Sequence, residues 1–182
     1  MQYALRTARL EDEPTLRTLI ARSIRALGAA DYTAAQIEGA LQGAFGVDTT
    51  LIRDGTYFVA EAEDGSVVAC GGWSRRRTLF GSDDRADRDE SWLDPGTDAA
   101  KIRAFFVDPA HTRQGLGALI LNRSENEAQR AGFKAFALMA TVPGARFYEK
   151  HGYIAEAAIS HPLAGGLSIS FVPMSKRAKP SA

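Results

Sequence analysis

Cysteine and histidine are scarce in this sequence of 182 residues, and it has no net charge. The one cysteine, Cys70, excludes an intramolecular disulfide framework and a thiolate zinc cluster, and it is compatible with a reducing cytosol. The three histidines are scattered along the chain, which disfavours a histidine metal site. We therefore expect no bound metal.

Long hydrophobic runs and an excess of basic residues are also absent. Lysine and arginine together number 22, as do aspartate and glutamate. Because proteins that neutralise many phosphates usually carry a basic excess, we expect no nucleic-acid partner. No apolar run approaches the roughly 18 residues that span a bilayer, and charges occupy the first residues, where a signal peptide has its apolar core. We therefore expect a cytoplasmic protein with no membrane partner.

Hydrophobic residues make up 45% of the chain, which at this length is enough for a sizeable core. Hydrophobic periodicity and turn residues predict strands and helices in the order β-α-α-β-β, then β-α-β-α-β-β. The expected strands cover residues 2–9, 56–63, 66–74, 101–107, 133–140, 153–159 and 167–174, and the later helices cover 116–130 and 144–150. This order predicts an α/β fold of the mixed α+β kind, with a mostly antiparallel central sheet flanked by helices.

The periodicity is lost between residues 75 and 98, where basic and acidic residues alternate. Loops of this length are usually functional or disordered, and a solvated charged loop is the simplest interpretation. We expect one domain over residues 1–175 with a charged insertion at about 76–98. Residues 176–182 are expected to form a polar C-terminal tail.

The segment FFVDPAHTRQGLGALIL, residues 105–121, has the strongest chemical pattern. A strand leads into a loop, and the loop opens a helix through Gly115 and Gly117. The first turn of a helix has unpaired N–H groups and a partial positive charge, and glycines let an anion approach these groups closely. The pattern therefore predicts a phosphate-binding loop.

Two common phosphate-binding loops do not fit these residues. A P-loop needs Lys and then Ser or Thr after its second glycine, whereas Ala118 follows Gly117 here. A dinucleotide fingerprint needs a third Gly or Ala three residues after the second, where this chain has Ile120. Nucleotide triphosphate hydrolysis and NAD binding are both disfavoured.

A second motif follows about thirty residues later, in GARFYEKHGY, residues 144–153. With the glycine loop, it resembles the GNAT superfamily of acyl-CoA-dependent N-acyltransferases, over residues 101–158 most specifically. The resemblance implies the GNAT fold and the transfer of an acetyl group from acetyl-CoA to a primary amine, by direct attack in a ternary complex. Many relatives pair through sheet edges, so a homodimer is possible.

The resemblance also implies a role for each matching position. The backbone of the strand would bind the pantetheine arm, and the loop amides would bind the pyrophosphate with help from the Arg113 side chain. Thr141 stands where many members have an asparagine that bonds the pantetheine, and Thr112 stands where they often have Gln or Arg. The expected acetyl-CoA residues are Phe105, Phe106, Val107, Arg113, Gln114, Gly115, Leu116, Gly117, Ala118 and Thr141.

Tyr148 falls on the position that usually acts as general acid in this family. Attack by an amine on a thioester expels a thiolate, which a nearby hydroxyl can stabilise or protonate. Full transfer from a tyrosine to a thiolate is uphill by about 1.5 pK units, so a strong hydrogen bond is more plausible than simple donation. The other interpretation of Tyr148 is an aromatic that covers the core.

The general base and the acceptor stay open at this point. The strand KIRAFFV has no glutamate, and the remaining possibilities are a water relay or one of Glu61, Glu63, Glu90, Asp98 and His111. The implied acceptor region comprises residues 27–33 and 160–167, with a contribution from residues 76–98. One alternative function is a non-catalytic acyl-CoA-binding module or sensor, and a structural protein is the third.

Overall fold

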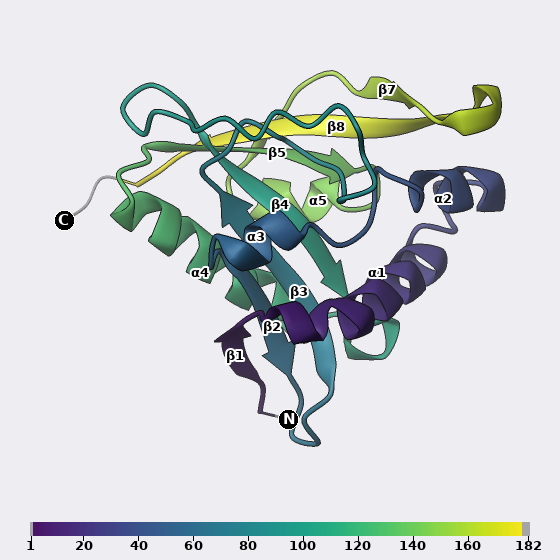
Figure 1. The fold of residues 1–182 in the computed structure, drawn as a ribbon, viewed down its shortest axis with the longest axis horizontal. Helices are drawn as coiled ribbons and strands as arrows, with labels where there is room; N and C mark the ends of the chain where they lie inside the picture. Colours follow the sequence, from purple (N-terminus) through teal and green to yellow (C-terminus); the bar gives the residue numbers. More distant parts are fainter. Residues whose placement is uncertain (1, 180–182) are drawn as a thin grey trace.

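The computed structural model describes residues 2–179. Its centre is an eight-stranded sheet in the order β1-β2-β3-β4-β5-β8-β6, with β7 pairing to β8 (Figure 1). Among the described pairings only β4–β5 is parallel, so the sheet is mixed and mostly antiparallel, as the sequence predicts. The strands are β1 (Ala4–Thr7), β2 (Tyr57–Glu61), β3 (Val67–Ser74), β4 (Ala100–Val107), β5 (Ala135–Thr141), β6 (Ile154–Ala155), β7 (Ile159–Pro162) and β8 (Ser168–Arg177).

Helices cover both faces of the sheet, and each face has its own hydrophobic core. In β2, Tyr57 and Val59 belong to the core under α1, whereas Phe58 and Ala60 belong to the core under α4. This alternation is what a strand buried on both faces requires. The helices are α1 (Glu13–Leu27), α2 (Ala34–Ala40), α3 (Thr49–Arg53), α4 (Leu116–Arg130) and α5 (Ala145–Lys150). Of the helices in residues 2–179, none combines the length and apolarity needed to cross a membrane.

A capping box opens α2. The amide of Gln36 donates to Oγ1 of Thr33, and the amide of Thr33 donates to Oε1 of Gln36 at 2.9 Å. These two bonds satisfy amides that the helix itself leaves unpaired. Helix α4 covers residues 116–130, the range that the apolar spacing predicts.

Three parts of the fold differ from the sequence prediction. The expected strand over 153–159 is two short strands, β6 and β7, and the gap between them lies opposite Val172 and Pro173 of β8. Pro173 has no N–H, so it cannot donate a ladder bond at this point. The short helix α3 was not predicted. Its five residues leave too little periodicity for a pattern to detect, although Asp48 caps its first turn.

Strand β8 also continues to Arg177, two residues into the segment predicted as a polar tail. The ammonium of Lys176 lies 2.7 Å from the Glu125 carboxylate on α4, and both side chains are largely buried. This ion pair fastens the end of the strand to the helix beneath it. Residues 180–182 of the predicted tail lie outside the described residues.

Candidate acetyl-CoA site

Strand β4 separates from its parallel neighbour, β5, after only two paired residues. It pairs with β5 only at Ala100 and Lys101, and Figure 1 shows the two strands diverging beyond that point. On its other side, β4 stays paired to β3 as far as Val107. The β5-facing backbone of residues 105–107 therefore has no strand partner among the described residues, which leaves an open edge in the middle of the sheet.

A β-bulge turns β4 at this position. Its register against β3 shifts between Cys70 and Gly72, and Ala104 has a positive φ of 56°. The buried Tyr57 hydroxyl donates to the Ala104 carbonyl at 2.8 Å, which satisfies a group that the bulge takes out of the ladder. A Cβ on Gly71 would lie 2.7 Å from the Phe105 ring. Gly71-Gly72 therefore lies at a bulge and is closely approached by the Phe105 ring.

The loop after β4 delivers the start of α4 to the same edge. Arg113 and Gly115 have φ values of 62° and 81°, and this left-handed backbone turns the chain into the helix. Among the described residues, no side chain caps α4. Its first amides are therefore available to an anion, as a phosphate-binding helix start requires. Gly117 also allows close packing, since a Cβ there would lie 3.1 Å from the Phe147 ring.

One cavity of about 520 Å³ follows the open edge and reaches the start of α4. Of the residues predicted to bind acetyl-CoA, all line this cavity except Gln114, which is exposed and accepts a hydrogen bond from the Tyr3 hydroxyl. Thr141 lines the cavity, and its Oγ1 accepts a hydrogen bond from the amide of Gly144. The structure thus brings these residues together, while their roles remain predictions.

Tyr148, on α5, lines the same cavity and is 8% exposed. Its ring packs edge-on against Phe105, with the centroids 6.1 Å apart, and against Phe147 at 5.0 Å. No hydrogen bond to its hydroxyl is formed within the described part of the chain. Burial raises the pKa of Tyr148 well above its usual value, because the phenolate loses its hydration. Tyr148 is therefore a neutral donor whose hydroxyl has no acceptor among residues 2–179.

The candidate bases are distributed unevenly around this cavity. His111 lines it and shares a 3.0 Å hydrogen bond with the Tyr3 hydroxyl. The four carboxylates are engaged elsewhere: Glu61 with Arg6, Glu63 with the backbone of Gln2, Glu90 with Arg88, and Asp98 with Arg77. None of the described Asp or Glu residues lines the cavity.

The charged segment of residues 75–98 is packed against the sheet, which differs from the solvated loop that its composition favours. Its residues Leu79, Phe80 and Gly81 line the cavity. Arg103 of β4 fixes them in place, donating at 2.8 Å to the carbonyl of Thr78 and at 2.8 Å to that of Gly81.

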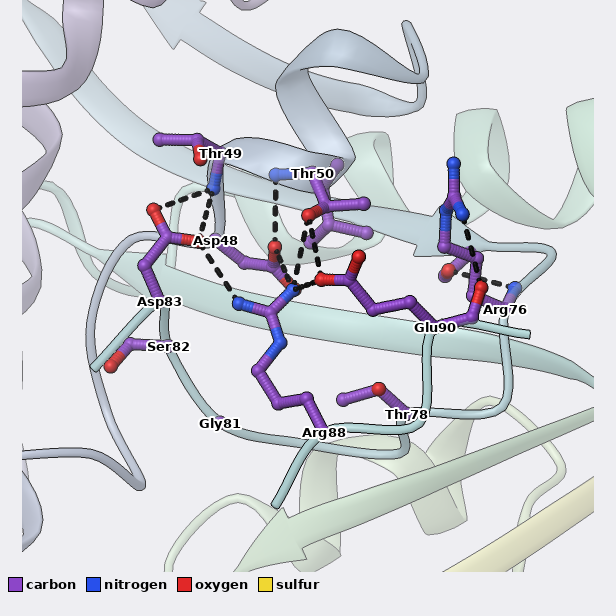
Figure 2. A network of polar contacts seen from close by, with 12 residues as sticks. Asp48, Thr49, Thr50, Arg76, Thr78, Gly81, Ser82, Asp83, Arg88 and Glu90 are labelled. Atoms are coloured by element: carbon purple, nitrogen blue, oxygen red, sulfur yellow. Dashed lines mark hydrogen bonds and ion pairs between the residues drawn. The ribbon is translucent and has the colours of Figure 1, made fainter. Parts of the chain in front are cut away.

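A buried ionic network completes this attachment. The Arg103 guanidinium donates to Asp48 at 2.8 Å, and both side chains are only 2% exposed. Arg88 binds the other oxygen of Asp48 at 2.7 Å, and it also forms ion pairs with Asp83 and Glu90 (Figure 2). Part of the charge in this segment is therefore paired inside the protein and is not exposed to solvent. The one sequence signal for this network is Arg103 itself, a charge in the middle of an apolar strand, which must be paired if it is buried.

Metal chemistry has no evident site here. Among residues 2–179, no group of three or more His, Cys, Asp or Glu side chains is placed to hold a metal ion. Cys70 lines the cavity, but burial raises the pKa of its thiol to about 12, so it is not a nucleophile at neutral pH.

This chain matches the model of a known protein family. Residues 53–155, more than half of the chain, match the model described as "Acetyltransferase (GNAT) domain". The match includes the open edge, the start of α4 and Tyr148. A search of curated protein sequences gives no significant match.

Solved structures share the fold along the whole chain. A GCN5-related N-acetyltransferase from Rhodopseudomonas palustris has a TM-score of 0.71 at 19% identity, with 98% of this chain and 97% of that one covered. The PaiA N-acetyltransferase of Thermoplasma acidophilum, solved with coenzyme A, has a TM-score of 0.67 at 17% identity, with 98% and 100% covered. A GNAT family acetyltransferase of Brucella melitensis, in complex with acetyl-CoA, has 0.59 at 15% identity, with 100% and 91% covered. Because the family model matches more than half of its length, this chain belongs to the GNAT acetyltransferase family.

Proposed function

We propose that this protein is an N-acetyltransferase that moves an acetyl group from acetyl-CoA to a primary amine, by direct attack in a ternary complex. One observation carries the proposal: the uncapped start of α4, the open edge of β4 and Tyr148 all line one cavity. A groove filled by the protein's own side chains would have excluded it.

In this proposal the coenzyme spans the cavity from the loop to Tyr148. The amides of residues 113–118 bind the pyrophosphate, and the Arg113 side chain adds a cation. The backbone of residues 105–107 pairs with the pantetheine arm as an added strand would. Thr141 also lies beside the pantetheine arm: its Oγ1 accepts a bond from Gly144, and its O–H is still able to donate one to the coenzyme.

The proposed chemistry places the thioester beside Tyr148. The amine nitrogen forms a bond to the acetyl carbonyl carbon, the C–S bond breaks, and the sulfur leaves with the electron pair. Tyr148 donates a hydrogen bond to that sulfur as negative charge develops on it. Its raised pKa makes full proton transfer less favourable still, so the hydrogen bond is its main contribution.

Two substitutions in the first turn of α4 test the proposal. Ala118 lines the cavity, whereas its neighbour Leu119 is 41% exposed and does not. Ala118→Glu sets a carboxylate against the pyrophosphate and should weaken acetyl-CoA binding at least tenfold, since a charged hydrogen bond contributes about 1.5–3 kcal/mol. Leu119→Glu adds the same charge to the same turn and should bind normally.

Isothermal titration calorimetry of acetyl-CoA measures both variants against the unsubstituted protein. No binding by the unsubstituted protein, or equal loss in both variants, would reject the proposed site. A thiol-release assay over a panel of amines then measures turnover.

A non-catalytic acyl-CoA-binding module or sensor is the alternative function. The absence of Asp and Glu from the described lining of the cavity favours it, because no carboxylate is placed to deprotonate an acceptor. Tight acetyl-CoA binding without thiol release on any amine would support this alternative over the enzyme.

We also propose a domain organisation, a location and an oligomeric state. A continuous sheet from β1 to β8 supports a single domain over residues 1–175. A cytoplasmic location and a homodimer rest on the sequence arguments given above.

A further inference from the structure

The charges that line the cavity have one sign. Arg113 is a cation on its wall, Arg103 is buried there in an ion pair with Asp48, and no carboxylate of the described residues lies among the lining side chains. The other titratable groups on its walls are His111, His151, Cys70, Tyr32 and Tyr148. A group that enters as a cation therefore meets cations or neutral groups, and it has no anion to replace its hydration.

The buried carboxylate attached to this wall is not available as a partner. Asp48 is 2% exposed and does not line the cavity. Its two oxygens bind Arg103 at 2.8 Å and Arg88 at 2.7 Å, and it also accepts the amide of Thr50. Asp48 therefore neutralises the protein's own arginines.

An aromatic cluster forms the wall of the cavity on this side. Phe171 lies 5.7 Å from Phe45 and 5.2 Å from Phe80, between ring centroids, and Phe106 lies 6.3 Å from Phe45. All four rings line the cavity, and Phe80 is only half-buried. The Arg85 guanidinium stacks 4.2 Å from the Phe80 ring centroid and His161 packs at 4.9 Å, so Phe80 offers the cavity the part of its ring that these two side chains leave uncovered. The Tyr32 hydroxyl is not available to a bound acceptor, because it donates to the Ser170 carbonyl and accepts a hydrogen bond from the Val142 amide.

These two observations define an acceptor class. We infer that the acceptor end of the cavity takes a primary amine in its uncharged form, carried on an apolar alkyl or aromatic body that packs on Phe80. This inference rests on the proposed acetyl transfer. Polyamines and lysine-rich peptides are excluded as preferred acceptors, because each brings further cations into a site without carboxylates.

An uncharged acceptor amine also explains why the described lining of the cavity has no carboxylate to act as a general base. A neutral amine has its lone pair free and attacks the acetyl carbon without prior deprotonation. As the C–N bond forms and the C–S bond breaks, the nitrogen releases one proton to solvent, and the departing thiolate takes up one proton from solvent while Tyr148 keeps its own. The reaction then consumes and releases no net proton, so no carboxylate is needed to hold one.

A matched pair of acceptors tests the inference. Hexylamine and 1,6-diaminohexane have the same chain length and the same reacting group, but the second carries a cation at its far end. We expect kcat/KM to be about 100-fold higher for hexylamine, with 2-phenylethylamine at least as good. For hexylamine, the KM expressed as total amine should fall tenfold for each pH unit between about 7 and 9, because only the free base binds.

Substitutions of Phe80 test whether the aromatic cluster binds the acceptor. Phe80→Ala should lower kcat/KM for hexylamine and 2-phenylethylamine by about tenfold or more, and Phe80→Leu should restore most of it. The matched control is Trp92→Ala, since Trp92 is an aromatic on the same segment that is 58% exposed and does not line the cavity. Acetyl-CoA affinity, measured by calorimetry, should be unchanged in all three variants.

The possible outcomes separate this inference from the function on which it rests. Equal or faster acetylation of 1,6-diaminohexane, or a KM independent of pH, overturns the acceptor class and leaves the acetyltransferase intact. Equal loss in Phe80→Ala and Trp92→Ala overturns the role of Phe80. Acetyl-CoA binding without turnover on any of the three amines overturns the enzyme itself.

Discussion

Tyr148 is the residue at which packing and chemistry meet. Three aromatic neighbours, Phe105, Phe147 and Tyr153, hold its ring at centroid distances of 5.0–6.1 Å. The same burial that fixes the ring raises the pKa of its hydroxyl. The hydroxyl is therefore rigidly placed and stays protonated, which suits a hydrogen-bond donor to a leaving thiolate.

Replacing Tyr148 with Phe removes this donor and keeps the ring. We expect kcat to fall by about 100-fold, with acetyl-CoA affinity unchanged, because general-acid groups typically contribute 100-fold or more. Stopped-flow or steady-state thiol release measures kcat, and calorimetry measures affinity. Unchanged turnover would remove Tyr148 from the mechanism.

Tyr153→Phe is the control for this variant. The Tyr153 ring lies 5.7 Å from Tyr148, but its hydroxyl donates to Glu125 and does not line the cavity. Its loss should reduce stability and leave kcat unchanged. A raised pKa also means that Tyr148 keeps its proton up to and beyond its ordinary value near 10, so the rate should show no decline from this group between about pH 7 and 9.

At the scale of elements, a buried ionic network joins β4 to the segment of residues 75–98. Arg103 and Asp48 are both 2% exposed, and Arg88 is 8% exposed beside them. Removing one partner of a buried ion pair costs more than the pair contributes, because the remaining charge is left without compensation.

Asp48→Asn tests this attachment. Asn keeps the volume and can still cap α3, but it leaves Arg103 and Arg88 without their shared carboxylate. We expect the free energy of unfolding to fall by about 3–5 kcal/mol in urea denaturation. Glu38→Gln, which breaks the exposed pair with Arg25, should cost no more than about 1 kcal/mol. Equal effects of the two changes would contradict a buried network.

Helices and strands with a regular hydrophobic period were predictable from the sequence, whereas the aromatic cluster that lines the cavity was not. Helix α4 and the bulge at Gly71-Gly72 follow from apolar spacing and from the lack of side chains on glycine. The contacts of Phe80 and Arg103 join positions more than twenty residues apart, in a segment without periodicity. Only the folded chain brings them together, so local patterns carry no record of them.

For the whole molecule, acetyl-CoA should act as a stabilising ligand. A ligand that binds only the folded state at 100 times its Kd adds about 2.7 kcal/mol to stability. For a chain of this size, that corresponds to a rise in Tm of about 5–10 °C. Differential scanning fluorimetry with acetyl-CoA measures the shift.

The two α4 variants again separate specific from general effects. Leu119→Glu should keep the rise in Tm, and Ala118→Glu should lose most of it. A shift of the same size in both would mean that the coenzyme binds somewhere other than the start of α4.

Arg103 lies one residue before the bulge at Ala104 and holds the carbonyls of Thr78 and Gly81. The segment that lines the cavity at Phe80 is therefore anchored to the strand that borders the same cavity. An engineer who moves residues 75–98 into another family member must transfer Asp48 and Arg103 with them. Without these two residues, the transplanted segment would lack its buried anchor and should not keep its position beside the cavity.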